Sequence, residues 1–147
     1  PKNIHLVIVG SGPLENEIKN LSMNHSNVDF LGYLPKNKVI PLIRGSFALL
    51  QPSFAEGIST TILEAMACKI PIIASNLGGN KELIINNENG FLINPQDPNE
   101  INEKIIELSE NKILVKNFGQ KSSELIKNFE WVNVGKKYLK LYESLLT

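Results

Sequence analysis

One segment of the chain sets its architecture: Glu56-Gly57-Ile58-Ser59-Thr60-Thr61-Ile62-Leu63-Glu64. It follows an apolar run, contains a glycine, and continues into the helix-forming residues Ala65-Met66-Ala67. This pattern predicts a strand, a loop and a helix, with Glu56 in the loop and Glu64 in the first turns of the helix. Both carboxylates then lie at the mouth of the strand–loop–helix unit, where free N–H groups of the helix N-terminus also point outward.

This mouth offers two kinds of binding group. Carboxylates accept hydrogen bonds from sugar hydroxyls, and a helix N-terminus favours phosphate. A ligand with a diphosphate flanked by sugars needs both kinds of group. The sequence therefore predicts a nucleotide-sugar site around Glu56 and Glu64.

Each glutamate also has an ordinary structural interpretation. Thr61 and Glu64 have the spacing of a capping box, with the threonine at the N-cap and the glutamate three residues later. Ser59 and Thr60 are alternative N-caps, and the true helix start decides whether Glu64 turns back to the backbone or points into the cleft. Glu56 alone is equally consistent with a solvated loop carboxylate.

Strands and helices alternate on both sides of this segment. Strands are expected at residues 4–9, 28–31, 47–51, 71–75 and 91–93, and helices at 14–25, 35–44, 59–68, 80–85, 98–109, 113–128 and 131–146. The continuous apolar run Ile4–Val9 is typical of a buried parallel strand. The alternation predicts an α/β fold, a Rossmann-like parallel sheet with helices on both faces. Ligands of such sheets bind beyond the carboxyl ends of the strands, where Glu56 and Glu64 both lie.

Composition narrows the class of protein. With 147 residues, 42% of them apolar, residues 1–147 are expected to form one domain with one sizeable core. Fifteen basic residues balance fifteen acidic ones, so charge gives no case for a nucleic-acid partner. Cys68 is the single cysteine, which excludes an internal disulfide and suits a reducing cytoplasm. No apolar run reaches the length of a membrane span.

Gly10 and Gly12 follow the first expected strand, where a dinucleotide-binding fingerprint has to be considered. The third glycine of that fingerprint would fall at position 15, which is Glu15. A glutamate there places a side chain and a negative charge where the pyrophosphate must approach closely, so the dehydrogenase interpretation fails. Two interpretations stay open for these glycines: a tight turn that needs backbone freedom, or a backbone contact with a ligand.

Several motifs in order resemble the signature of the group 1 glycosyltransferases, also called family 4. The central ones are Pro52-Ser53, Glu56-Gly57, Leu63-Glu64-Ala65-Met66-Ala67, Pro71-Ile72-Ile73-Ala74-Ser75 and Gly78-Gly79 to Glu82. The flanking ones are Ile8-Val9-Gly10-Ser11-Gly12-Pro13, Asn89-Gly90-Phe91-Leu92-Ile93 and Asp29-Phe30-Leu31-Gly32-Tyr33-Leu34, the last of which resembles the family's base-pocket segment. The resemblance covers nearly the whole chain and is least specific in the C-terminal helices.

The resemblance implies the C-terminal, donor-binding half of the GT-B architecture, in which two Rossmann-like domains face each other across a cleft. Such enzymes are retaining hexosyltransferases that move a sugar from a nucleoside-diphosphate sugar to a glycan, lipid or other acceptor. They need no metal and no other cofactor. Family habit further implies polysaccharide biosynthesis in a bacterium, in the cytoplasm or at the inner face of the cell membrane.

The same resemblance assigns roles to individual residues. Glu56 is the catalytic candidate and accepts hydrogen bonds from donor-sugar hydroxyls, and Glu64 binds the ribose hydroxyls. The other donor-binding positions act through the backbone: Gly57, Ile58 and Ser59 toward the sugar and diphosphate, Gly32, Tyr33 and Leu34 toward the base, and Gly10 and Gly12 at the first turn.

Three departures from the family pattern matter. Lys69 stands where the family has glycine, so either a positive φ strains it or it only changes the helix end, and the second interpretation is favoured. Ser59 replaces another glycine, which a helix start accommodates. The family's phosphate-binding arginine and lysine lie on a βα unit upstream of Ile4 that is expected to be missing, together with the N-terminal acceptor domain. We therefore expect a gap in the strand order, no activity from this part alone, and any peripheral membrane association through the missing domain.

Two other classes of function stay open. One is a non-catalytic GT-B-like module that binds nucleotide-sugars or serves as an interaction surface. The other is a different GT-B-like enzyme, a nucleotide-sugar epimerase or a sugar phosphorylase, although neither a catalytic histidine with acids nor a cofactor lysine is found. His5 and His25 have no Cys or His neighbour at metal-ligand spacing, so no metal site is expected.

The last expected helix carries an apolar stripe at helical spacing. We interpret this stripe as packing on the domain's own core, with lysines on the rest of the helix. The resemblance leaves an alternative open for part of it, an exposed interface, because the family's terminal helix commonly crosses back to the N-terminal domain. Its members are Trp131, Val134, Tyr138, Leu141, Tyr142 and Leu145.

Overall fold

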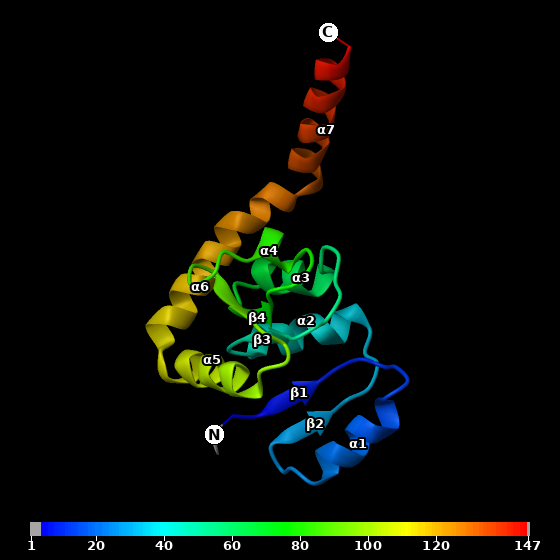
Figure 1. The fold of residues 1–147 in the computed structure, drawn as a ribbon, viewed down its shortest axis with the longest axis vertical. Helices are drawn as coiled ribbons and strands as arrows, with labels where there is room; N and C mark the ends of the chain where they lie inside the picture. The colour runs from blue at the N-terminus through cyan, green and yellow to red at the C-terminus, as the bar shows by residue number, and fades with distance from the viewer. Residues whose placement is uncertain (1–3, 147) are drawn as a thin grey trace. The chain divides into compact units, whose positions relative to one another are not determined.

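The computed structural model describes residues 4–146 and divides the chain into two compact units, residues 1–45 and 46–147 (Figure 1). The first unit contains β1 (Leu6–Ile8), α1 (Glu15–Met23), β2 (Val28–Phe30) and α2 (Lys36–Gly45). The second contains β3 (Leu49–Gln51), α3 (Thr60–Ala67), β4 (Ile72–Ser75), α4 (Asn80–Leu83), β5 (Gly90–Ile93), α5 (Pro98–Glu110), α6 (Lys112–Leu125), the 3-10 helix η1 (Ile126–Phe129) and α7 (Trp131–Leu145). Every expected strand and helix is present, with ends shifted by a few residues, where such assignments are least certain.

In the first unit, β1 and β2 form a parallel pair in which Leu6 lies opposite Val28. None of the three residues of β1 is buried: Leu6 is 38% and Val7 41% exposed, and Ile8 is half-buried. Ile43 is the one buried residue among residues 4–45. The expectation that Ile4–Val9 forms a buried strand is therefore wrong for the described residues, because β1 belongs to a two-stranded sheet with few packed neighbours.

In the second unit, β3, β4 and β5 form a parallel sheet in that order, with Leu50 opposite Ile73 and Ile73 opposite Phe91. All four residues of the central strand β4 are buried, as a parallel strand covered on both faces should be. The five strands thus form two parallel sheets with flanking helices, which confirms the α/β fold class.

The core of the second unit lies on both faces of this sheet. On one face, α5 and α6 cover a buried cluster formed by Ile73, Phe91, Ile93, Leu108 and Phe118. Because side chains alternate along a strand, Ile72 and Ala74 point to the opposite face, where α3 contacts β3 and β4 through its buried residues.

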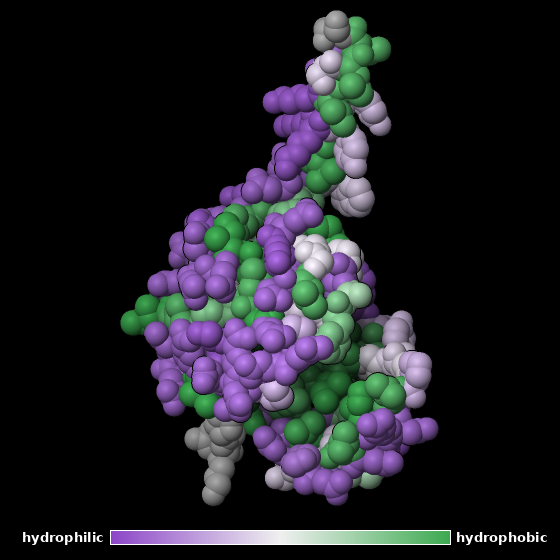
Figure 2. Space-filling view, in the orientation of Figure 1, coloured by the Kyte–Doolittle hydropathy of each residue, from purple (hydrophilic) through white to green (hydrophobic). Residues whose placement is uncertain are grey.

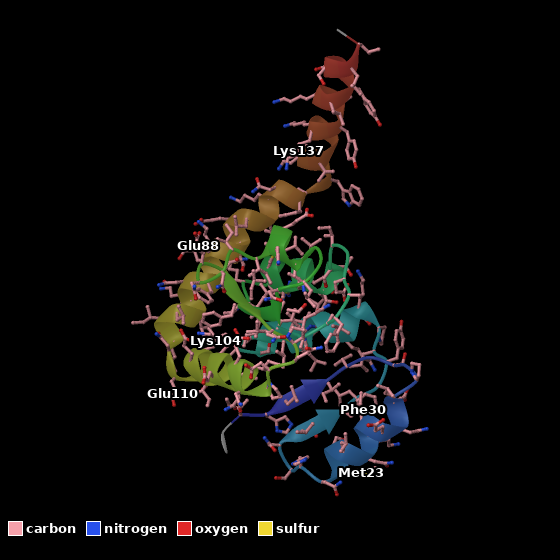
Figure 3. The ribbon with its side chains drawn as sticks, viewed as in Figure 1. Met23, Phe30, Glu88, Lys104, Glu110 and Lys137 are labelled. Carbon is pink, nitrogen blue, oxygen red and sulfur yellow. The ribbon has the colours of Figure 1, made fainter. Side chains whose placement is uncertain are left out.

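Phe91 of β5 packs against the helices that cover this face of the sheet. Its ring meets the Phe118 ring edge-on, with centroids 5.2 Å apart. The ammonium group of Lys104, labelled in Figure 3, lies 4.5 Å from the centroid of the Phe91 ring. Edge-to-face pairs and cations over rings are both favourable, so these contacts fix α5 and α6 on the sheet.

Helix α3 ends in a Schellman motif with Lys69 in the left-handed conformation, at φ 61°. The N–H of Ile70 donates to the Ala65 carbonyl over 2.9 Å, and the N–H of Lys69 donates to the Met66 carbonyl over 3.1 Å. This is the position at which helices usually carry glycine. The interpretation that Lys69 only changes the helix end is therefore wrong: the motif requires a positive φ from a lysine.

Helix α7 follows η1 and extends away from the β3–β4–β5 sheet (Figure 1). Hydrophobic atoms follow one side of this helix and hydrophilic atoms the other (Figure 2). None of its residues is buried, and Trp131 is 90% exposed. The interpretation that its apolar stripe packs on the domain's own core is therefore wrong. The helix contacts η1 and then extends beyond the helices and strands that form the core.

Within residues 4–146, none of the helices combines the length and the apolar character that a bilayer crossing requires.

Candidate functional site

Ser59 begins helix α3, which resolves the choice among three N-caps. Its backbone is extended (φ −72°, ψ 117°), and its hydroxyl oxygen accepts a hydrogen bond from the Ile62 N–H at 3.4 Å. That N–H belongs to the third helical residue, the usual partner of an N-cap side chain. Ser59 is only 4% exposed, so the cap is part of the packed structure.

The position of the cap changes the interpretation of Glu64. Thr61 lies inside the first turn of α3, so it is not the N-cap, and the capping box from Thr61 to Glu64 does not form. Ile62 occupies the position from which a glutamate would reach back to Ser59. Glu64 lies one turn into the body of the helix, where its side chain is half-buried.

Glu56 lies in the loop between β3 and α3, and Gln51 holds its side chain. The Gln51 side-chain amide donates a hydrogen bond to Glu56 Oε1 over 2.9 Å, and both side chains are half-buried. Glu56 is thus not a freely solvated loop carboxylate. Sequence reasoning missed Gln51, although a polar residue at the end of the apolar strand 47–51 was a signal that could have drawn attention to it.

The backbone of the Glu56 loop packs against two consecutive glycines that follow β4. The N–H of Gly79 donates to the Glu56 carbonyl over 3.1 Å, and Gly78 has a φ of 56°. A Cβ on Gly78 would overlap the Glu56 carbonyl oxygen, and one on Gly79 would overlap the Gly57 carbonyl oxygen. Both positions therefore require glycine, so that the β4–α4 turn can approach the loop.

Asn80 fixes this turn from the inside. Its side-chain amide is fully buried and donates to the carbonyl oxygen of Ser75 over 3.1 Å and to the Ser75 hydroxyl over 3.0 Å. The end of β4 is thereby tied to the start of α4. Asn80 Oδ1 is buried and has no hydrogen-bond partner among the described residues.

In the first unit, two glycines meet at the carboxyl ends of β1 and β2. Gly10, at φ 143°, donates its N–H to the carbonyl of Gly32, at φ 63°, over 2.8 Å. Both angles lie in the region that favours glycine, which supports the interpretation of Gly10 as part of a tight turn. Gly12 has no positive φ, and its carbonyl accepts from the Glu15 N–H over 3.1 Å.

The two residues after Gly32 differ in exposure. Tyr33 is 74% exposed, whereas Leu34 is half-buried. The peptide groups of this segment follow β2 directly and lie at the carboxyl end of the strand pair. That is where the sequence places a ligand-binding segment.

The residues predicted to form the site thus fall into two groups, each gathered at the carboxyl ends of parallel strands. The first unit holds Gly10, Gly12, Gly32, Tyr33 and Leu34, and the second holds Glu56, Gly57, Ile58, Ser59 and Glu64. Nothing lies within 4 Å of where a Cβ on Gly57 would be, so the space beside the loop backbone is open.

The charges near these groups include no cluster suited to a metal ion. Across residues 4–146, no group of three or more His, Cys, Asp or Glu side chains is placed to hold one. His5 is instead paired with Asp29 across β1 and β2, with Nε2 2.8 Å from Oδ2 in an exposed contact.

Comparison with known proteins gives relatives over nearly the whole chain. The family described as Glycosyl transferases group 1 matches residues 1–125. An uncharacterized glycosyltransferase of Methanocaldococcus jannaschii is 35% identical over 140 residues, which are 94% of this chain and 40% of that protein. A UDP-Gal:alpha-D-GlcNAc-diphosphoundecaprenol alpha-1,3-galactosyltransferase of Escherichia coli is 32% identical over 112 residues, 74% of this chain and 28% of that protein.

The fold is shared with solved structures. A sucrose-phosphate synthase of Thermosynechococcus elongatus is similar with a TM-score of 0.83 and 26% sequence identity, over 97% of this chain and 38% of that chain. The structural neighbours are GT-B glycosyltransferases, as the sequence resemblance implied. The chain spans less than half the length of each of these three proteins.

Proposed function

The chain belongs to the group 1 glycosyltransferases, and from this premise we propose that it forms the donor-binding part of a retaining glycosyltransferase. It binds a nucleoside-diphosphate sugar, whose sugar passes to a glycan, lipid or other acceptor. One observation carries the proposal: the Glu56 loop and the Ser59-capped start of α3 are adjacent in one unit, beside open space at Gly57. The site thus offers carboxylate and N–H groups together.

The diphosphate is assigned to the N-terminus of α3. The first N–H groups of a helix lack intrahelical partners and carry the positive end of the helix dipole. Ser59 satisfies the N–H of Ile62, which leaves the earlier N–H groups of the helix to a ligand. An anion of the diphosphate type suits this position, and the transfer is proposed to need no metal ion.

The donor sugar is assigned to Glu56. An ionised carboxylate has about four acceptor positions on its two oxygens. Gln51 uses one of them, on Oε1, so several remain for hydroxyl groups of a sugar. Such charge-assisted bonds are stronger than neutral ones, which makes Glu56 the candidate for holding the sugar during transfer.

The nucleoside is assigned to two further places. Glu64 is a half-buried carboxylate in the first turns of α3, and by the family resemblance it is assigned to the ribose hydroxyls. The peptide groups of Gly32, Tyr33 and Leu34 are assigned to the base. The Escherichia coli relative is named for a UDP-Gal donor, which makes a uridine nucleotide the first ligand to test.

Saturation-transfer NMR tests the proposal on this chain with UDP, GDP and ADP and with their common sugars. We expect selective transfer to one nucleotide. Glu64→Gln should weaken its binding by about tenfold or more, because a charge-assisted hydrogen bond contributes about 1.5–3 kcal/mol. The matched control is Glu82→Gln on α4, an exposed glutamate that should leave binding unchanged. If the amide spectrum shows a folded protein and no saturation is transferred to any of the nucleotides, the proposal is contradicted.

A further inference from the structure

Gln51 and Glu56 are joined although each belongs to a different kind of element. Gln51 is the last residue of β3, and its register partner Ala74 is fully buried in β4. The strand therefore fixes the start of the Gln51 side chain. Glu56 belongs to the loop that follows, and the 2.9 Å hydrogen bond from Gln51 Nε2 to Glu56 Oε1 spans the loop entrance.

The same glutamate is also held through its main chain. The N–H of Gly79 donates to the Glu56 carbonyl, and Gly78 approaches this carbonyl too closely for any Cβ. The end of β3 thus fixes the carboxylate, and the turn after β4 fixes the backbone. A glutamate in a surface loop would otherwise distribute over several rotamers, at a cost in free energy when a ligand selects one of them.

The chemistry of Gln51 suits a carboxylate that must keep its charge. Its amide donates a hydrogen bond without bringing a positive charge, so Glu56 remains an acceptor for hydroxyl groups. A lysine or arginine here would neutralise the carboxylate and compete with the ligand for its oxygens.

We propose that Gln51 is a positioning residue, which holds the Glu56 carboxylate in the orientation that receives the donor sugar. This inference rests on the proposed function. It assigns to Gln51 an effect on the sugar of the donor and none on its nucleoside diphosphate. A residue that merely supported the fold would affect both ligands alike.

The first test compares two ligands on one variant. Gln51→Leu replaces the amide with an apolar side chain of similar bulk and removes the donor. We expect the affinity for the nucleotide-sugar to fall about fivefold to tenfold, the loss of roughly one oriented hydrogen bond, while the affinity for the matching nucleoside diphosphate stays unchanged. Gln120→Leu, an exposed glutamine on α6, is the matched control and should change neither affinity.

The second test uses pH. Gln51→Glu keeps the shape of the side chain but places a second carboxyl group against Glu56. Two carboxylates this close cannot both ionise at little cost, so the pKa of one of them is raised. Below that raised pKa the two carboxyl groups share one proton, so the introduced glutamate can again donate a hydrogen bond to Glu56. Nucleotide-sugar binding by this variant should therefore improve from about pH 8 to about pH 5.5, whereas binding by the wild-type chain should not.

The outcomes distinguish the positioning role of Gln51 from the proposed function on which it rests. If the wild-type chain binds nucleotide-sugar and Gln51→Leu lowers both affinities equally, or neither, the positioning role is overturned and the proposed function stands. If the folded wild-type chain binds no nucleotide and no nucleotide-sugar, the proposed function fails and this inference fails with it. A loss confined to the nucleotide-sugar, together with the pH-dependent rescue, supports the positioning role.

Discussion

Gly119 of α6 lies so close to Lys69 that a Cβ on the glycine would overlap the Lys69 carbonyl oxygen. Lys69 is the left-handed residue that ends α3, so the two helices meet at backbone distance where one of them terminates. This contact fixes the end of the helix whose N-terminus forms the candidate diphosphate site. Four predictions on stability follow from this contact and from others in the second unit.

Gly119→Ala should destabilise the second unit by about 1–3 kcal/mol, because the added methyl group forces α6 away from a backbone carbonyl. The free energy of unfolding, measured by urea titration followed by circular dichroism, checks this. Gly135→Ala in α7 is the matched control, since a Cβ there meets nothing within 4 Å. An unchanged unfolding midpoint for Gly119→Ala would contradict the close contact.

Lys69→Gly should stabilise the chain. A side chain in the left-handed region costs about 1–2 kcal/mol, and part of this gain is offset by the greater freedom of glycine in the unfolded chain, so a net gain of about 0.5–1 kcal/mol is expected. Thermal unfolding measures the effect. Lys69→Ala separates conformation from charge: it retains the positive φ and should bring no such gain.

Ser59→Ala should cost about 0.5–2 kcal/mol, because the Ile62 N–H loses its partner at a buried helix start. Thr61→Ala is the informative comparison, since Thr61 was an alternative N-cap and lies inside the first turn. It should change the stability much less. The reverse order of the two effects in a urea titration would mean that α3 begins at Thr61.

Lys121→Gln should lower stability by a small amount that disappears in alkali. The hydrogen bond and the negative charge of Glu88, whose Oε2 lies 2.9 Å from Lys121 Nζ, raise the pKa of Lys121 above its ordinary 10.5. Because the pKa is raised on folding, the stabilisation is complete below the unfolded value of 10.5 and is lost as pH rises beyond it. The effect is small because the pair is solvent-exposed.

Urea midpoints at about pH 8 and about pH 11.5 measure this dependence, since the two values lie on either side of the ordinary lysine pKa. Lys116→Gln, on the same helix and without an ion pair among residues 4–146, is the control. A difference between wild type and Lys121→Gln that persists undiminished at the higher pH would contradict the assignment. Glu88 is labelled in Figure 3.

Local pattern was sufficient for the order and type of the elements. The β-branched run of β4 and the helical spacing of apolar residues in α5 and α6 can each be recognised in a short stretch of sequence. Both elements appear in the structure as expected. The motifs around Glu56 and Glu64 also placed both glutamates correctly, one in a loop and one in the helix after it. Periodicity and turn residues decide such features locally.

Pattern was not sufficient where the outcome depended on neighbours far along the chain. An apolar run looks the same in a covered strand as in an uncovered one, so the exposure of β1 was missed. Three consecutive hydroxyl residues, Ser59, Thr60 and Thr61, offered equally good N-caps, and the burial of Ser59 selected one. The same holds for α7, whose stripe indicates a helix but not what covers it.

The sequence by itself determined that this chain is an α/β protein with a carboxylate-bearing loop before a helix. Tertiary structure decided the geometry of that loop. Gln51 reaches Glu56 only because the loop folds back on its own strand, and Gly79 reaches Glu56 from a turn more than twenty residues later. Lys69 takes a positive φ because the two hydrogen bonds of the Schellman motif that ends α3 require it. The hydrogen bond from Gly79 to Glu56 joins backbone atoms of distant segments, and no local pattern of side chains records it.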